Sequence, residues 1–270
     1  MPIPMSIVDA FTDTAFAGNP AGVCILDEDR DTQWMQLVAR EMNHPETAFL
    51  LPRADHVALR WFTPAVEVDL CGHATLGSAH ILWETGRMQP AETIRFRTRS
   101  GVLTATREGE WIRLDFPALT PERTDVPPGL ADVLGAKIVS AAKSRFDLLI
   151  ELESEAAVRE LTPDLGLLVQ QPYRGVIVTA QAANDEHYDC VSRFFAPKVG
   201  VNEDPVTGSA HCVLGPFWGE RLGRQSLIGY QASARGGIIK MELAGERIIL
   251  AGKAVTTLTG NLVATDPTTQ

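Results

Sequence analysis

The chain has 270 residues, of which 45% are hydrophobic and 21% charged. This composition excludes a disordered chain, and the length is typical of about two domains. The net charge is −10, so the surface repels phosphate groups and a nucleic-acid partner is not expected.

Membrane and cofactor signals are also missing from the sequence. No apolar run approaches the roughly 20 residues of a membrane span, and residues 1–11 lack the basic start of a signal peptide. The four cysteines form no CxxC pair, and the six histidines show no metal-binding spacing. Neither GxGxxG nor a P-loop occurs. We therefore expect a cytoplasmic protein that binds no membrane, metal or nucleotide cofactor.

The expected elements are mostly short strands with a few helices. Helices are predicted from Asp31, as N-cap, to about Asn43, and then over 73–85, 155–161 and 209–222. Gly86 and Gly223 follow the second and fourth helices as stop signals, and Pro216 is expected to bend the fourth. β-rich runs predict strands at 57–63, 93–98, 102–106, 111–116, 137–142, 146–152, 175–181, 189–196, 238–243 and 247–251. Residues 117–129, with four prolines, are the best linker candidate.

The two halves of the sequence repeat each other. Residues 71–114 align without a gap on 207–250 with ten identities in 44 pairs. The match places Gly72 on Gly208; chance similarity of two β-rich segments is the alternative, but the shared strand–helix–strand order favours duplication. We therefore predict an α+β fold of two pseudo-symmetric domains, each a mostly antiparallel, barrel-like sheet around a central helix. The expected domains are 1–116, completed by a C-terminal strand at about 258–270, and 117–257.

Each repeat starts its helix with a small glycine turn, CGHAT at 71–75 and TGSAH at 207–211. Glycine lets the backbone approach a ligand closely, and free N–H groups at a helix start favour an anion. Two such turns facing an interdomain cleft would hold a small carboxylate. The alternative is that the glycines only allow helix packing, with Ser209 as an N-cap.

Titratable residues flank these turns. His73 follows Gly72, and Asp204 precedes the second turn, beside Glu203; one of these two acids is expected to point away. Glu46 begins an apolar segment, where a carboxylate is suited to proton transfer near neutral pH. The alternative for Glu46 is a surface position after a turn. Cys71 is a candidate nucleophile or, alternatively, a small core residue.

Several motifs in order resemble the PhzF family of phenazine-biosynthesis-like isomerases. They are Asp9-Ala-Phe, Gly18-Asn-Pro-Ala, Glu46-Thr-Ala-Phe, Arg60-Trp-Phe-Thr-Pro, Cys71-Gly-His-Ala-Thr, Arg193-Phe-Phe-Ala-Pro, Glu203-Asp-Pro-Val-Thr-Gly-Ser-Ala-His and Arg235-Gly-Gly. The resemblance spans residues 9 to about 260. It implies a fold like that of diaminopimelate epimerase, a homodimer, a small-molecule carboxylate as substrate and no cofactor.

The resemblance also assigns roles to residues. It implies that Glu46 is the acid/base and that His73 and Asp204 contact polar groups of the substrate as catalytic residues. Carboxylate binding falls to Gly72, Gly208 and Ser209. The best-known family activity isomerises trans-2,3-dihydro-3-hydroxyanthranilate.

One departure bears on the related epimerases, which use one cysteine from each half. Here Cys71 aligns with Thr207, whose hydroxyl is too weak an acid to replace a thiol. The two-cysteine route is therefore disfavoured, although a pair of Glu46 and Cys71 stays open. The alternatives to an isomerase are a cofactor-independent amino-acid epimerase or racemase and a non-catalytic carboxylate-binding protein.

Overall fold

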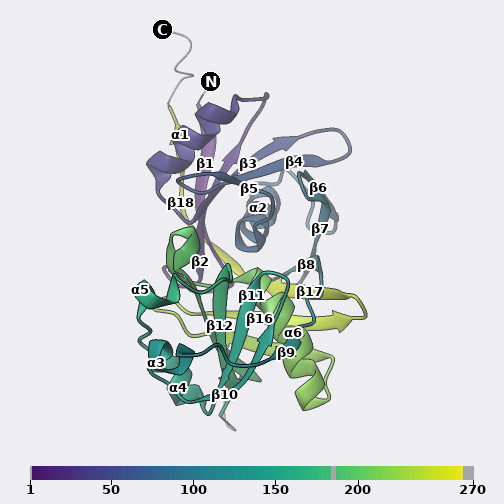
Figure 1. The fold of residues 1–270 in the computed structure, drawn as a ribbon. Helices are drawn as coiled ribbons and strands as arrows, with labels where there is room; N and C mark the ends of the chain where they lie inside the picture. Colours follow the sequence, from purple (N-terminus) through teal and green to yellow (C-terminus); the bar gives the residue numbers. More distant parts are fainter. Residues whose placement is uncertain (1, 184–186, 264–270) are drawn as a thin grey trace. The chain divides into compact units, whose positions relative to one another are not determined.

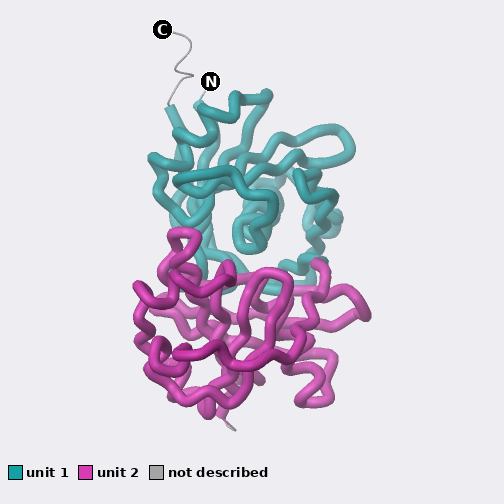
Figure 2. The backbone as a smooth tube through the Cα atoms, in the orientation of Figure 1, with its two compact units in different colours: residues 1–115, 251–270 teal, residues 116–250 magenta. Residues whose placement is uncertain are grey.

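The computed structural model describes residues 2–183 and 187–263, which form two compact units (Figure 2). Unit 1 combines the chain up to Asp115 with the chain from Ala251 on, and unit 2 is Phe116–Leu250. The sequence placed these boundaries after residues 116 and 257. The C-terminal strand expected at about 258–270 is β18, Ala254–Leu262; residues 264–270 lie outside the described part.

Unit 1 is a curved sheet with one helix on each face (Figure 1). Strand β1 pairs antiparallel with β18 and β2; β2 and β3 are parallel, β3 and β4 antiparallel, and β4 runs parallel to β6. β4 also pairs antiparallel with β5, and β7 with β6 and β8. The bounds are β1 (Ile3–Ala10), β2 (Asn19–Ile25), α1 (Thr32–Met42), β3 (Glu46–Pro52), β4 (Val57–Phe62), β5 (Glu67–Val68), α2 (Gly72–Glu84), β6 (Ile94–Thr98), β7 (Gly101–Glu108) and β8 (Trp111–Pro117).

Strand alternation assigns the two faces of this sheet to different helices. Trp34 of α1 packs edge-on against Phe49 of β3, with ring centroids 6.0 Å apart, in one apolar cluster. Val8 of β1 and Val23 of β2 face the other side, where they contact α2 at Gly77. A Cβ on Gly77 would lie 3.4 Å from Val8, so the missing side chain lets α2 lie close to the strands. α2 is therefore buried on most sides, and its first turn lies inside unit 1.

Unit 2 repeats this pattern of pairings. Strand β10 pairs antiparallel with β9 and β11; β11 and β12 are parallel, β12 and β13 antiparallel, and β13 runs parallel to β15. β13 also pairs with β14, and β15 with β16. The bounds are β9 (Glu122–Thr124), α3 (Leu130–Leu134), β10 (Ile138–Lys143), β11 (Asp147–Leu152), α4 (Glu155–Arg159), α5 (Leu165–Leu168), β12 (Gly175–Gln181), β13 (Cys190–Ala196), a 3₁₀ turn η1 (Pro197–Val199), β14 (Val201–Asp204), α6 (Gly208–Leu222), β15 (Ser226–Gln231), β16 (Gly237–Ala244) and β17 (Arg247–Gly252).

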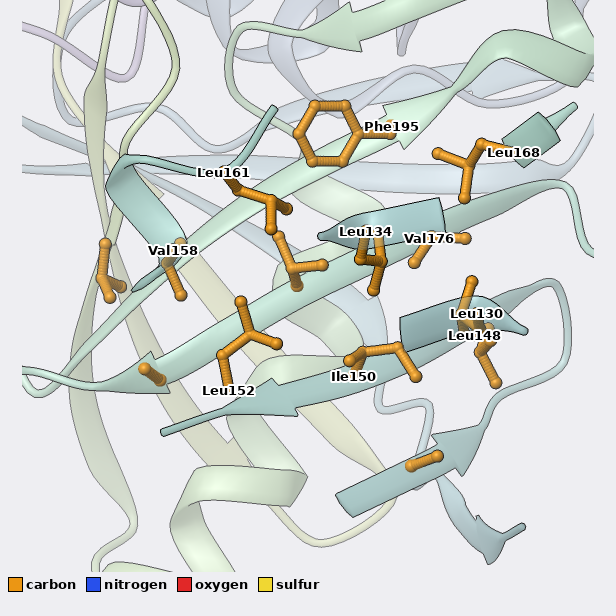
Figure 3. Packing of buried hydrophobic residues seen from close by; sticks show 14 residues of the cluster. Leu130, Leu134, Leu148, Ile150, Leu152, Val158, Leu161, Leu168, Val176 and Phe195 are labelled. Atoms are coloured by element: carbon orange, nitrogen blue, oxygen red, sulfur yellow. The ribbon is translucent and has the colours of Figure 1, made fainter. Parts of the chain in front are cut away.

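Three short helices cover one face of the unit 2 sheet, where unit 1 has α1. Leu130, Val158 and Leu168 of α3, α4 and α5 pack in one cluster with Ile150 and Val176 of the strands (Figure 3). On the other face, α6 packs on β15 and β16. Each unit thus encloses one central helix, α2 or α6.

The predicted fold class is confirmed, and the repeat appears element by element. The central helices begin at Gly72 and Gly208, and β7 and β16 begin at Gly101 and Gly237. As expected, α2 is followed by Gly86 in the left-handed region, and the cap of α6 is left-handed Gly223.

Several details of the prediction were wrong. The N-cap of α6 is Thr207, so Ser209 lies inside the first turn and is not the cap. The helix predicted over 155–161 ends at Arg159, and the expected linker 117–129 contains β9, which pairs with β10. Strands β1, β2, β5, β14 and β15 and helices α3 and α5 were not predicted. Pro and Gly within β2, and Gly229 in β15, lower the strand signal there. No helix among the described residues has the length and apolar character needed to cross a membrane.

Candidate functional site

In unit 1, two predicted catalytic residues meet at the start of α2. Glu46 is the first residue of β3, and His73 is the second residue of α2. His73 Nε2 lies 3.1 Å from Glu46 Oε2, and the two side chains are only 6% and 19% exposed. The sulfur of Cys71 lies near both ring nitrogens of His73, 3.5 Å from Nδ1 and 4.0 Å from Nε2. Glu46 therefore contacts His73 with most of its side chain shielded from solvent.

The electrostatics separate the roles of these three side chains. Burial by itself lowers the pKa of His73, but the acidic groups of Cys71 and Glu46 outweigh burial and hold that pKa well above its usual value. Burial, assisted by the charge of Glu46, raises the pKa of Cys71 to about 11. At neutral pH the thiol of Cys71 is therefore protonated, and the hydrogen bond and charge of Glu46 favour the protonated form of His73.

The same three side chains offer metal-ligand atoms within 4.8 Å of one another. Carboxylate, thiolate and imidazole are all zinc ligands. This grouping was not predicted, because Glu46 is remote from Cys71 and His73 along the chain. A metal would have to displace the protons held by Cys71 and His73.

In unit 2, Asp204 is held by a hydrogen-bonded chain. The Thr207 hydroxyl donates to Oδ2 of Asp204 at 2.5 Å. Fully buried Gln231 donates from Nε2 to Oγ1 of Thr207 at 3.2 Å and to the backbone carbonyl of Asp204 at 2.7 Å. Its Oε1 accepts from the Thr207 N–H at 2.8 Å. The carboxylate of Asp204 is therefore fixed at the end of β14, directly before α6.

The neighbouring acid has a structural role instead. Glu203 accepts two hydrogen bonds from Arg193, at 2.7 and 2.9 Å, and so ties β14 to β13. Glu67 accepts the same pair of bonds from Arg60, at 2.7 and 2.8 Å, between β5 and β4. The repeat thus identifies Glu203 as the acid that points away from the turn.

The two glycine turns have the local geometry predicted for them. Gly72 and Gly208 are the first residues of α2 and α6. Within the described residues, neither N-cap side chain, Cys71 nor Thr207, accepts a hydrogen bond from its helix. The amides of both first turns therefore carry the partial positive charge of a helix start without a side-chain cap.

Ser209 has a partner that the sequence did not suggest. Arg174, in the loop before β12, donates from Nη2 to Oγ of Ser209 at 3.0 Å. Arg174 also forms an ion pair with Asp147. Arg174, Asp147 and Gln231 were all missed, because each reaches the turn through strand pairing and no local motif marks them.

Each unit thus gathers its own predicted residues. Unit 1 brings together Glu46, Gly72 and His73, and unit 2 brings together Asp204, Gly208 and Ser209 in one turn. We refer to these groups, with their partners, as the unit 1 half-site and the unit 2 half-site.

Comparison with known proteins extends this picture over nearly the whole chain. Residues 8–260 match the model of the PhzC-PhzF family, described as phenazine biosynthesis-like protein. An uncharacterized isomerase of Halalkalibacterium halodurans is 54% identical over 97% of this chain and 99% of its own. A crystal structure of a PhzF-family phenazine biosynthesis protein from Enterococcus faecalis superposes with a TM-score of 0.94 at 43% identity, covering 98% of this chain and 100% of the other.

A more distant structure shares the fold alone. A predicted epimerase from Pseudomonas aeruginosa has a TM-score of 0.74 at 19% identity, covering 97% of this chain and 100% of its own. These comparisons confirm the family resemblance, the epimerase-like fold and the expectation of an isomerase. The chain belongs to the PhzC-PhzF, or phenazine biosynthesis-like, family.

Proposed function

We propose that the protein moves a proton between carbon atoms of a small unsaturated carboxylic acid of the trans-2,3-dihydro-3-hydroxyanthranilate type. The observation that carries the proposal is the buried pair of Glu46 and His73 at the start of α2. A largely buried carboxylate can accept a proton from carbon and is shielded from exchange with solvent, and the contact with His73 at 3.1 Å fixes the position of its oxygen.

In this mechanism Glu46 acts alone as acid and base. Its carboxylate accepts the proton from one carbon, and the electron pair of the broken C–H bond delocalises into the conjugated system of the substrate. The neutral carboxyl then returns the proton to a second carbon on the same face. The family resemblance assigns the polar groups of the substrate to His73 and Asp204 and its carboxylate to Gly72, Gly208 and Ser209.

Cys71 supports a second candidate, an epimerase in which Glu46 and Cys71 serve opposite faces of one carbon. The thiol lies 3.5 Å from His73. Against this candidate, the pKa of Cys71 is raised to about 11, and its counterpart Thr207 donates its hydroxyl to Asp204. A single carboxylate is therefore the favoured acid/base.

Isotope tracing tests the proposal. The full-length protein is incubated in light water with trans-2,3-dihydro-3-hydroxyanthranilate, and with related ring acids, that carry deuterium at the carbon to be deprotonated. We expect part of that deuterium to reappear at the second carbon of a rearranged product, as measured by NMR, because one shielded carboxyl carries it. Glu46→Gln should form the product at least about 10²-fold more slowly, whereas the matched change Glu41→Gln, at an exposed position of α1, should leave the rate unchanged.

The other outcomes identify the alternatives. Inversion at one carbon, without movement of the double bond, would favour the epimerase. Binding of these acids without turnover of any would favour a non-catalytic carboxylate-binding protein. Full activity of Glu46→Gln would contradict the proposed role of Glu46.

For the assembly we propose a homodimer, on the family resemblance alone. Light scattering of the purified protein should then give twice the chain mass of 29.4 kDa. A mass equal to that of one chain would contradict it.

A further inference from the structure

Unit 2 contains a buried ion pair that the mechanism above does not use. Asp147, the first residue of β11, has a side chain that is 0% exposed. Arg174 donates to its two oxygens, from Nε at 2.9 Å and from Nη2 at 2.5 Å. A fully buried carboxylate is costly unless it is paired in this way. The guanidinium also lies over the rings of Phe146 and Phe194, at 5.3 and 5.7 Å from their centroids, so its position is fixed by several contacts.

The ion pair with Asp147 engages only some of the hydrogen-bond donors of Arg174. A guanidinium has five N–H donors: Nε–H and one Nη2–H bond Asp147, and the other Nη2–H is directed to Ser209 Oγ at 3.0 Å. No acceptor among the described residues contacts Nη1, and the side chain is 37% exposed. Two donors of a rigidly held guanidinium therefore point away from the ion pair.

The bond to Ser209 also fixes what that hydroxyl can do. Because Arg174 donates to Ser209 Oγ, the hydroxyl hydrogen is free to be donated elsewhere. The Ser209 O–H and the Nη1–H groups of Arg174 then form neighbouring donors, which suit the two oxygens of a carboxylate.

We propose that Arg174 binds the carboxylate of the substrate together with Ser209, and that Asp147 is the positioning residue that holds Arg174. The inference rests on the proposed function and assigns recognition of the substrate's carboxylate to the guanidinium of Arg174, so the amide or ester of the same acid should bind more weakly. A neutral amide would give these donors a single carbonyl oxygen and would bring an N–H group against them.

Strand register explains why only unit 2 has this arrangement. In unit 1, the parallel strands β2 and β3 place Ala21 beside Glu46. In unit 2, β11 and β12 place Asp147 beside Gly175. The acidic residue therefore lies on the second strand of the pair, β3, in unit 1 and on the first strand, β11, in unit 2. From β11, Asp147 binds Arg174. The same place in the repeat offers a proton acceptor in unit 1 and anchored donors in unit 2.

The test compares an acid with its amide as ligands. Binding of 2-aminobenzoate and 2-aminobenzamide to the full-length protein is measured by isothermal titration calorimetry. We expect the wild type to prefer the acid by at least about tenfold, which is about 1.4 kcal/mol. Arg174→Leu alone would leave Asp147 buried without a partner, so Arg174 is replaced in the double variant Asp147→Asn/Arg174→Leu. In this variant the acid should bind at least about tenfold more weakly, with no change for the amide.

Two further variants separate binding from general disturbance. Glu151→Gln/Arg221→Leu removes another acid–arginine pair of unit 2, which involves the last turn of α6, and should keep the preference for the acid. Ser209→Ala should weaken acid binding in the wild type and have a smaller effect in the double variant, because the two residues act on one carboxylate.

An unchanged preference for the acid in Asp147→Asn/Arg174→Leu would overturn the inference. The inference would also be overturned if the wild type bound the acid and the amide equally, or bound neither of them. The proposed function fails by a different measurement. Loss of the Glu46-dependent isotope transfer leaves the acid preference in place, whereas loss of the acid preference leaves the isotope transfer testable.

Discussion

The two half-sites occupy corresponding positions of the repeat but contain different side chains. In unit 1, the start of the central helix holds three titratable side chains in contact, Glu46, His73 and Cys71. In unit 2, the corresponding turn holds Asp204 through Thr207 and Ser209 through Arg174. In unit 1 the contacts join titratable side chains, whereas in unit 2 a hydroxyl and a guanidinium hold the side chains of Asp204 and Ser209.

This difference indicates how one fold can serve an asymmetric reaction. A racemase with one thiol in each half needs equivalent groups in both copies, and here Thr207 replaces the second thiol. Its hydroxyl now donates to Asp204. The duplication is kept in the strands and in the Arg60–Glu67 and Arg193–Glu203 pairs, while the helix starts have diverged.

The largest effect should come from removing the proton acceptor of unit 1. Glu46→Gln keeps the shape of the side chain but cannot accept a proton, so kcat should fall by roughly 10²–10⁴-fold, the range for a positioned general base. Ligand affinity should change little. Asp204→Asn, the corresponding change in unit 2, should raise KM more than it lowers kcat. If both variants lower kcat equally, the assignment of proton transfer to Glu46 and of substrate binding to Asp204 is wrong.

A smaller effect is expected from loosening Asp204. Thr207→Val removes the hydroxyl that donates to the carboxylate and leaves the Thr207 N–H bond to Gln231 intact. A hydrogen bond to a charged group contributes about 1.5–3 kcal/mol, so we expect KM to rise about tenfold or more. Steady-state kinetics measure this, with Thr106→Val at an exposed position of β7 as control. An unchanged KM would mean that Thr207 does not position Asp204.

Local signals allowed much of the fold to be predicted, because the ends of helices and the alternation of strands depend on residues that are close together in the sequence. The starts at Gly72 and Gly208 and the stops at Gly86 and Gly223 are examples. Thr207 shows the limit: from its place in the repeat we predicted a missing thiol, but not its bond to Asp204.

Contacts between side chains on different strands could not be predicted from the sequence. Arg174 reaches Ser209 because β11 and β12 place Asp147 beside the start of β12, and Gln231 lies in β15, which was not predicted. The roles assigned to Glu46 and His73 came from the family resemblance, since no periodicity relates β3 to the start of α2. The structure shows that these two side chains meet, and their roles stay predictions.

The charge of the unit 1 half-site should also appear in the pH dependence of stability. The pKa of His73 is raised in the folded protein, so its stabilising effect is complete below the unfolded value of about 6.5 and is lost as pH rises through the folded value. The free energy of unfolding should therefore decrease above about pH 6.5, by at most about 1.4 kcal/mol per pH unit for one proton.

Urea denaturation of the wild type and of His73→Gln between about pH 6 and 9.5, below the titration of Cys71, measures this effect. The variant should show a flatter profile. His80→Gln is the control, because the pKa of His80 is lowered by burial and its loss should leave the slope in place. Identical slopes for the wild type and His73→Gln would show that His73 is not held charged by its neighbours.

The smallest effect is expected at Cys71, the residue that most resembles an epimerase base. Burial raises the pKa of its thiol to about 11, so almost no thiolate is present at neutral pH, and a hydroxyl can occupy the same N-cap position before Gly72. Cys71→Ser should therefore keep turnover within about threefold of the wild type, far from the 10²–10⁴-fold attributed to a general base. Measuring kcat for Cys71→Ser and Glu46→Gln on the same substrate compares the two groups directly. A loss in Cys71→Ser as large as that in Glu46→Gln would mean that both groups transfer protons, and the unit 1 half-site would then act as a two-base epimerase without help from a thiol in unit 2.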